Sequence, residues 1–120
     1  MINSRAKGAR SLAKAKAHAT SLGATCVVLY QQTGWWKTGT AQPFDLMVFH
    51  PHHPPILVEV RSNQWGLNKP QTLAMAALPG IMPKQIWLFR NGFQTPIIRQ
   101  WEATQGQWGH AHLETPWRDA

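Results

Sequence analysis

Two carboxylates stand in apolar runs of the kind that form buried β-strands. The chain has five Asp and Glu residues among 120, and two of them are Asp45 in the run FDLMVF and Glu59 in the run ILVEVR. Removing an ionised carboxylate from water is costly unless a partner compensates its charge. The residue types and their setting therefore predict a divalent-cation site.

The spacing of these residues predicts how they lie relative to one another. Side chains alternate along a strand, so Glu59 and Arg61 share one face. If the two runs pair as a hairpin with its turn near His52, Asp45 lies opposite Glu59, with their Cβ atoms about 5 Å apart. Two carboxylates this close repel each other, and one takes up a proton unless a cation lies between them.

A cation between Asp45 and Glu59 would support hydrolysis of a phosphodiester. Mg²⁺ or Mn²⁺ prefers oxygen ligands and retains water molecules, and such an ion activates a water for attack on phosphorus. Arg61, on the same face as Glu59, is placed to hold the scissile phosphate or to orient the water. A different interpretation also fits the pattern: Glu59 and Arg61 form an ion pair on an edge strand, and Asp45 caps the preceding loop.

The overall composition favours a polyanionic partner inside the cell. The net charge is +7, the pI is near 10.4 and there are seven Trp residues; phosphates attract Lys and Arg, and bases stack on aromatic rings. No window approaches the ~18 apolar residues of a membrane span, and the basic N-terminus lacks the apolar stretch of a secretory signal. We expect one intracellular domain over residues 1–120, whose single Cys26 is a buried, inert thiol.

Hydrophobic periodicity predicts the order helix, three strands, helix, two strands. Gly23 is placed to end the first helix, and Pro70 opens the second. Residues from about 103 onward follow no clear pattern and are not assigned. The expected elements are a helix over 4–22, a buried strand over 25–31, hairpin strands over 44–49 and 56–61, a helix over 70–78, and strands over 85–90 and 97–101.

Basic residues of the first helix are candidates for contacts with nucleic acid. Lys7, Arg10, Lys14 and His18 recur at helical spacing on one face, which is either a solvated surface or a phosphate-contacting one. The buried stripe of the same helix lies on another face and comprises Leu12, Ala15, Ala19 and Leu22.

The segment before Asp45 carries Trp35, Trp36 and Lys37 between glycines. Adjacent Trp residues in a loop either stack on unpaired bases or wedge a junction open. The alternative is that one of them packs onto the sheet. Both readings stay open at this point.

Two histidine-rich segments are not expected to extend the cation site. His50, His52 and His53 lie in the hairpin turn, roughly 17 Å from the carboxylates for about five residues at ~3.3 Å each. We expect a solvated turn there. His110 and His112 form a two-ligand pattern without the third partner that a zinc site needs.

These motifs resemble the PD-(D/E)XK nuclease superfamily, and within it the archaeal-type Holliday-junction resolvases and related small phage nucleases. The family signature is an acid that opens the second strand and Glu-x-Lys on the third, here Asp45 and the segment EVR at 59–61. The family's first helix begins with a basic-Lys-Gly element, matched by RAKG at 5–8, and closes on a glycine, matched by Gly23. The resemblance covers residues 4 to about 102.

Three positions depart from the family pattern. Leu12 stands where the family commonly has a Glu, and Arg61 replaces the Lys of Glu-x-Lys. Lys can shift its pKa and help to manage a water molecule, whereas Arg stays charged and serves as a fixed donor. RecB-like relatives have Gln-x-x-x-Tyr on the second helix; Gln71 matches the Gln, while Met75 replaces the Tyr.

The resemblance implies a restriction-endonuclease-like α/β core, with a mixed five-stranded sheet flanked by helices. It implies a homodimeric endonuclease that hydrolyses DNA at Holliday junctions or other branched structures. Asp45, Glu59 and the Val60 carbonyl would hold Mg²⁺ or Mn²⁺, Arg61 would contact the phosphate, and Gln71 is an accessory candidate. Contacts to the DNA backbone would come from Lys7, Arg10, Lys14 and Lys37.

Two other classes of function stay open. A nuclease-fold module that has lost turnover would bind nucleic acid without cutting it, and Leu12 and Arg61 favour this alternative. A small interaction protein would instead use its Trp residues to contact another protein. Cleavage that depends on Mg²⁺ distinguishes an enzyme from both.

Overall fold

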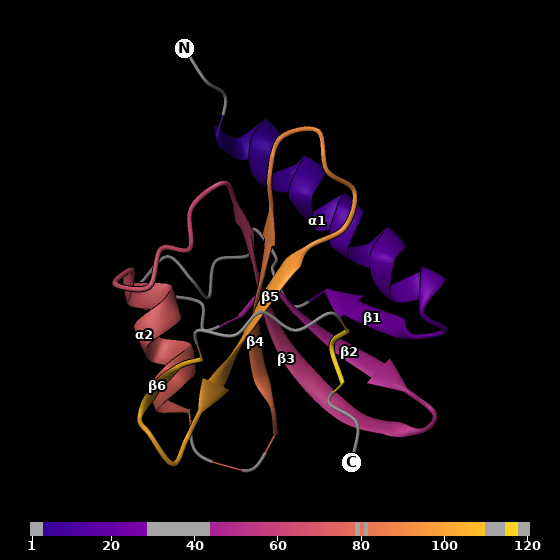
Figure 1. Cartoon of the computed structure of the whole chain (residues 1–120). Helices are drawn as coiled ribbons and strands as arrows, with labels where there is room; N and C mark the ends of the chain where they lie inside the picture. The colour runs from indigo at the N-terminus through magenta and orange to yellow at the C-terminus, as the bar shows by residue number, and fades with distance from the viewer. Residues whose placement is uncertain (1–3, 29–43, 79, 81, 110–114, 118–120) are drawn as a thin grey trace, which may run out of the picture.

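A six-stranded sheet with the strand order β1-β2-β3-β4-β5-β6 forms the centre of the fold (Figure 1). The elements are α1 (Ser4–Ser21), β1 (Thr25–Val28), β2 (Leu46–His50), β3 (His53–Ser62), α2 (Pro70–Ala77), β4 (Lys84–Phe89), β5 (Ile97–Glu102) and β6 (Gln107–Trp108). The computed structural model describes residues 4–28, 44–78, 80, 82–109 and 115–117, with the backbone alone for 4–9 and 71.

The predicted order of elements is confirmed as far as β5, and the predicted sheet is one strand short. β6 lies in the segment after residue 103 that the sequence pattern left unassigned, and it pairs with β5 through Trp101 and Trp108. Its two residues are too few to show a period-2 pattern. The rings of the two Trp residues pack edge to face with their centroids 5.3 Å apart, so the pair covers the end of the sheet.

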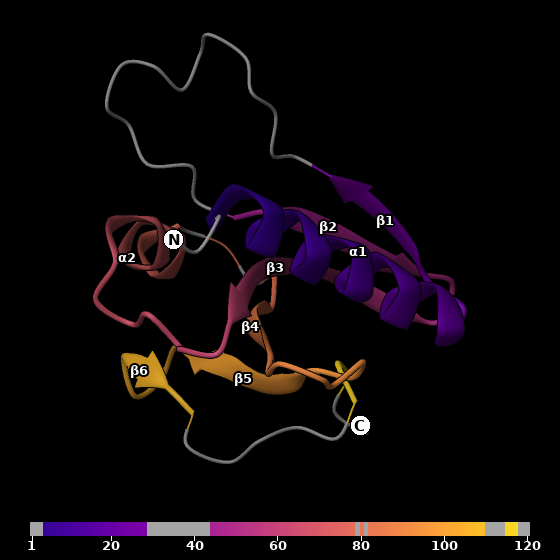
Figure 2. The ribbon, with the colours of Figure 1, turned by 90° about the horizontal axis from the view of Figure 1, so that it is seen from above.

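The sheet is mixed because β3 and β4 run parallel, while all other neighbours run antiparallel. A parallel pair needs a crossover connection, and the segment containing α2 provides it. The core has one cluster on each face: Ala15 of α1 packs with Val58, and Met75 of α2 packs with Leu57. Adjacent β3 residues point to opposite faces, so the two helices lie on either side of β3 (Figure 2).

The first helix follows its predicted bounds and buries its predicted stripe. Ala15 and Ala19 have no exposed surface, and Leu12 packs against the same core cluster. The helix ends as expected at Gly23, whose φ of +81° is a conformation that glycine adopts without strain. His18 is half-buried, and its ring lies 5.6 Å from the ring of Trp87, so it is not part of a solvated basic face.

The prediction of a buried strand after the first helix is wrong in one respect. β1 is the edge strand of the sheet, and Val27 keeps 45% of its surface exposed. Cys26 on the other face packs against the core cluster and is half-buried, and burial raises the pKa of its thiol. The apolar run reflects this one packed face rather than burial on both faces.

The second helix follows its predicted bounds, and Lys84 binds its C-terminal end. Pro70 occupies the first turn, as the sequence predicts. The Lys84 Nζ donates hydrogen bonds to the carbonyl oxygens of Ala76, at 3.1 Å, and of Leu78. Carbonyls at a helix end lack partners within the helix, so this lysine fixes the end of α2 to the start of β4.

The predicted solvated turn is shorter than expected, because His50 belongs to β2 and His53 to β3. His52 and His53 are exposed, whereas His50 is half-buried. The Trp117 ring stacks on the His53 ring with centroids 4.7 Å apart and lies 4.8 Å from the His50 ring. The C-terminal segment 115–117 therefore packs against this turn.

Several predicted residues cannot be placed. Trp35, Trp36 and Lys37, and also His110 and His112, lie outside the described residues. Within the described part of the chain, neither helix has the length and apolar character that crossing a membrane requires.

Burial of His18 predicts that stability depends on pH. Burial lowers the pKa of His18, so the unfolded chain binds a proton there more readily than the folded one. The free energy of unfolding should be fully retained above the unfolded pKa of about 6.5 and should fall as the pH drops through the lower folded value. Urea unfolding at several pH values checks this, and the variant H18F should show a weaker dependence than the wild type. Equal pH slopes for the two proteins would contradict the prediction.

Candidate active site

Asp45 lies immediately before β2, and its side chain binds the backbone of β3. The Asp45 N–H donates to the Val58 carbonyl at 2.9 Å, and the Val60 N–H donates to Asp45 Oδ2 at 2.7 Å. The β2–β3 ladder pairs Leu46 with Val58, and the same register continued by one residue places Asp45 opposite Glu59; nearer the turn, the register shifts between Val48 and His50. The predicted hairpin register is thus confirmed along the ladder that leads to the site.

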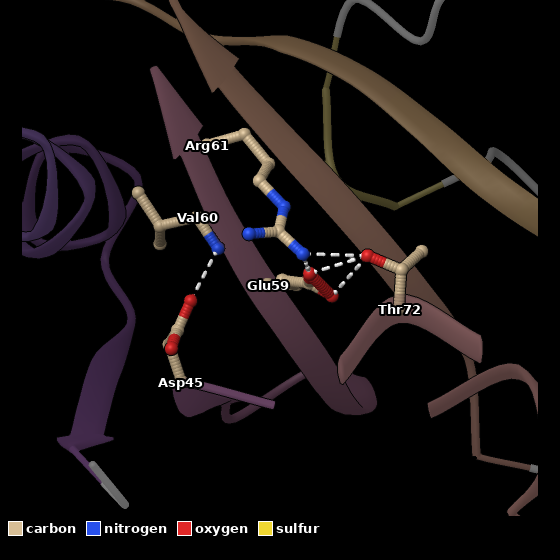
Figure 3. A network of polar contacts seen from close by, with 5 residues as sticks. All are labelled: Asp45, Glu59, Val60, Arg61 and Thr72. Atoms are coloured by element: carbon tan, nitrogen blue, oxygen red, sulfur yellow. Dashed lines mark hydrogen bonds and ion pairs between the residues drawn. The ribbon is translucent and has the colours of Figure 1, made fainter. Parts of the chain in front are cut away.

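Glu59 is fully buried, and its carboxylate has two side-chain partners (Figure 3). The Thr72 hydroxyl donates to Glu59 Oε1 at 2.6 Å, with Oε2 3.1 Å away. The Arg61 Nη2 forms an ion pair with Oε1 and donates to the Thr72 Oγ1 at 2.6 Å. A hydroxyl can donate one hydrogen bond and accept others. The Thr72 hydroxyl therefore donates to the carboxylate and accepts from the guanidinium at the same time.

The two carboxylates face different partners in this arrangement. Figure 3 shows Asp45 directed at the Val60 amide and Glu59 directed at Arg61 and Thr72. The ion pair that the sequence left open as an alternative is therefore present, although β3 lies inside the sheet rather than at its edge. Among the described residues, no group of three or more His, Cys, Asp or Glu side chains is placed to hold a metal ion.

The groups around the Arg61 guanidinium only partly compensate the cost of removing its charge from water. Burial lowers the pKa of Arg61, while the negative charge of Asp45 acts in the opposite direction. Its side chain is 14% exposed, and its Nε is buried with no hydrogen-bond partner among the described residues. Gly66 packs against this side: a Cβ there would lie 3.4 Å from Nε, and its φ of +61° also favours glycine.

A serine pair holds α1 against the end of β3, on the face of the sheet opposite Glu59 and Arg61. The hydroxyls of Ser11 on α1 and Ser62 on β3 lie 2.5 Å apart, and Ser62 directly follows Arg61. Arg10 is exposed and Lys14 is partly exposed, while Lys7 lies in the same helix with only its backbone described. This contact fixes the helix that carries the predicted phosphate-binding residues beside the end of β3.

Thr72 is a site residue that sequence reasoning missed. It follows Gln71, whose side chain is outside the described residues, in the first turn of α2. The available signal was its helical spacing to Met75, since residues three apart share a face. Met75 is buried, so a hydroxyl at 72 points into the interior, where a polar group needs a partner.

Arg99 and Trp65 form a second cation-bearing feature on the face of the sheet that carries Glu59. Glu59 pairs with Ile86 on β4, and Ile86 pairs with Arg99 on β5, so the three form one row across the sheet. The Arg99 Nε donates to the Gly109 carbonyl at 2.7 Å, and its guanidinium carbon lies 5.1 Å from the centroid of the Trp65 ring. This arginine is therefore fixed two strands away from Glu59.

Together these elements define an α/β fold whose mixed sheet carries a polar site at the start of a β-hairpin. No family model matches the sequence, and a search of curated proteins gives no match. Among solved structures, the fold is similar to that of Hjc from Archaeoglobus fulgidus, a Holliday junction resolvase from an archaeal hyperthermophile. The TM-score is 0.53 at 11% sequence identity, over 81% of this chain and 78% of that one. The likeness confirms the predicted class of fold, and the resemblance to the PD-(D/E)XK superfamily stays a prediction.

The buried hydroxyl of Thr72 should contribute to stability. Replacing it in T72V keeps the shape but removes a donor to the Glu59 carboxylate, which we expect to lower the free energy of unfolding by about 2 kcal/mol. Urea unfolding measures this change. The matched control is T20V, because Thr20 on α1 is exposed and its hydroxyl donates to the Lys16 carbonyl within the same helix. Equal losses in the two variants would argue against a buried polar network.

Proposed function

We propose that this chain is a metal-dependent endonuclease that hydrolyses DNA phosphodiesters at Holliday junctions or other branched structures. The observation that carries the proposal is the hydrogen bond from the Val60 amide to Asp45, which holds an acid beside the segment 59–61. The similar fold of a Holliday junction resolvase supports the choice of branched DNA. The expected assembly is a homodimer, as the family resemblance implies.

The residues present fit Mg²⁺ or Mn²⁺ in their donor chemistry. Asp45, Glu59 and the Val60 carbonyl offer the oxygen ligands that these cations prefer. A bound ion would activate a water and neutralise charge on the leaving oxygen. In the present arrangement Arg61 compensates the charge of Glu59 instead.

The chain's own residues supply binding and orientation. Arg61 carries a permanent charge and a fork of donors that matches a phosphate, so its role is to hold the scissile group in place. Arg10 and Lys14 are candidates for the flanking phosphates, together with Lys7 and Lys37. Trp35 and Trp36 would stack on unpaired bases, which branched DNA offers.

A second candidate function is a nuclease-fold module that binds nucleic acid without cutting it. The observation that favours it is the closed network of Glu59, Arg61 and Thr72, in which the carboxylate is already neutralised. Leu12 adds to this case, because it packs in the core where the family commonly has a carboxylate.

Cleavage of a four-way junction, a flap and a linear duplex with Mg²⁺ or Mn²⁺ tests the enzymatic proposal. We expect the branched substrates to be cut, and D45N and E59Q each to slow cleavage about a hundredfold or more because each removes a cation ligand. The control is E102Q, which removes a carboxylate on β5. Binding without cutting, unchanged by D45N or E59Q, would favour the binding module.

The salt dependence of binding tests the role of α1. R10Q and K14Q should each weaken binding to every DNA tested and reduce the slope of log K against log salt by about one, since each removes one phosphate contact. Fluorescence anisotropy between 50 and 200 mM salt, a range in which phosphate contacts are readily distinguished, measures both. K16Q is the matched control, because Lys16 is exposed on a different face of α1. A similar loss in all three variants would indicate a general charge effect rather than a binding face.

A further inference from the structure

Glu59 already holds a cation that belongs to the chain. We propose that Arg61 competes with the divalent ion for Glu59, that Thr72 is the positioning residue that keeps the pair closed, and that a DNA phosphate releases Glu59 by taking the guanidinium. This inference rests on the proposed function, and it adds an order of events: the DNA backbone makes the carboxylate available to the metal.

The contacts of Glu59 are what a divalent ion would have to replace. Thr72 donates to the carboxylate and accepts from Arg61, so its hydroxyl holds both charged groups at once. All three side chains belong to one network, and Glu59 and Thr72 have no exposed surface. The guanidinium disfavours a divalent ion at Glu59 as long as it stays in place, because two positive charges on one carboxylate repel each other.

The ion pair with Glu59 leaves one hydrogen-bond donor of Arg61 unused. Its Nε is buried without a hydrogen-bond partner among the described residues, which is rare for a buried donor. A phosphate offers two oxygens in the geometry of the guanidinium fork, so it can bind through two parallel hydrogen bonds. Part of the side chain is exposed, which gives a phosphate a route to displace Glu59.

Competition of this kind couples the two ligands. If DNA raises the affinity for the metal by a given factor, the metal must raise the affinity for DNA by the same factor. Couplings between binding sites are typically between about 5-fold and 150-fold. The effect of Arg61 on metal binding in the absence of DNA is therefore the direct measure of the competition.

The first experiment titrates the full chain with Mn²⁺ without DNA and follows free Mn²⁺ by its EPR signal. We expect R61Q to bind Mn²⁺ about tenfold more tightly than the wild type, within the usual range of coupling. T72V should also bind Mn²⁺ more tightly than the wild type. T72S should bind Mn²⁺ with the wild-type affinity, because Ser keeps the hydroxyl. The matched control R99Q removes an equal charge from the same face of the sheet without touching Glu59.

The second experiment adds a four-way junction with charged phosphorothioate linkages at the crossover, or the same junction with uncharged methylphosphonates there. In the wild type, the charged junction should increase Mn²⁺ affinity about tenfold relative to the uncharged one. In R61Q the difference in Mn²⁺ affinity between the two junctions should be smaller, because the variant has no guanidinium for a phosphate to draw away from Glu59. Far-UV circular dichroism confirms that each variant is folded, and T72V provides the test if R61Q is not.

The outcomes separate the inference from the proposed function. If E59Q abolishes Mn²⁺ binding while R61Q and T72V leave the affinity unchanged or weaker, the site is real and the competition is overturned. Equal effects of R61Q and R99Q also overturn it, since they would reflect overall charge. If E59Q binds Mn²⁺ as the wild type does, the proposed metal site fails, and the competition fails with it.

Discussion

A buried negative charge in the middle of the sheet is the constraint on which the rest of the structure depends. Glu59 has no exposed surface and lies on an inner strand, so its ionised form requires compensation from nearby groups. Arg61 is within reach because it shares the face of Glu59, and Thr72 comes from the crossover that the parallel β3–β4 pair requires. The topology of the sheet and the neutralisation of one carboxylate are therefore linked.

The end of β3 beyond Glu59 is fixed by side chains as much as by the ladder. Asp45 accepts from the Val60 amide just outside the paired region of β2. Asn63, just after the end of β3, adopts a φ of +64°. Its side-chain amide donates to the Asn91 side chain and accepts from the Asn91 backbone N–H in the β4–β5 turn. Asn tolerates this conformation better than most residues, so the strand ends sharply and the segment after it returns over the site.

Local patterns in the sequence predicted the elements, and nonlocal contacts decided what was missed. Alternation was sufficient for the hairpin register from Leu46 to Val48, because a slip of one residue would expose the apolar face, but it did not predict the shift of register between Val48 and His50. The edge position of β1 depends on which strands pair with it, which no local run of residues reveals. The direction of the Glu59 carboxylate depends on Thr72, 13 residues away along the chain. The pattern offered the Glu59–Arg61 pair as one of two interpretations, but it did not indicate Thr72.

The identity of the cation at position 61 determines how the carboxylate is released. A lysine in this place can lose its proton when buried, and its flexible stem allows it to move away from an acid. Arginine stays charged, so a proton exchange does not open the pair, and an anion must displace it instead. Leu12 packs against the core cluster at the position where the family resemblance would imply a further carboxylate. Under the proposed function, a site with a permanent internal cation would gain most from a ligand that supplies negative charge itself, as the DNA backbone does.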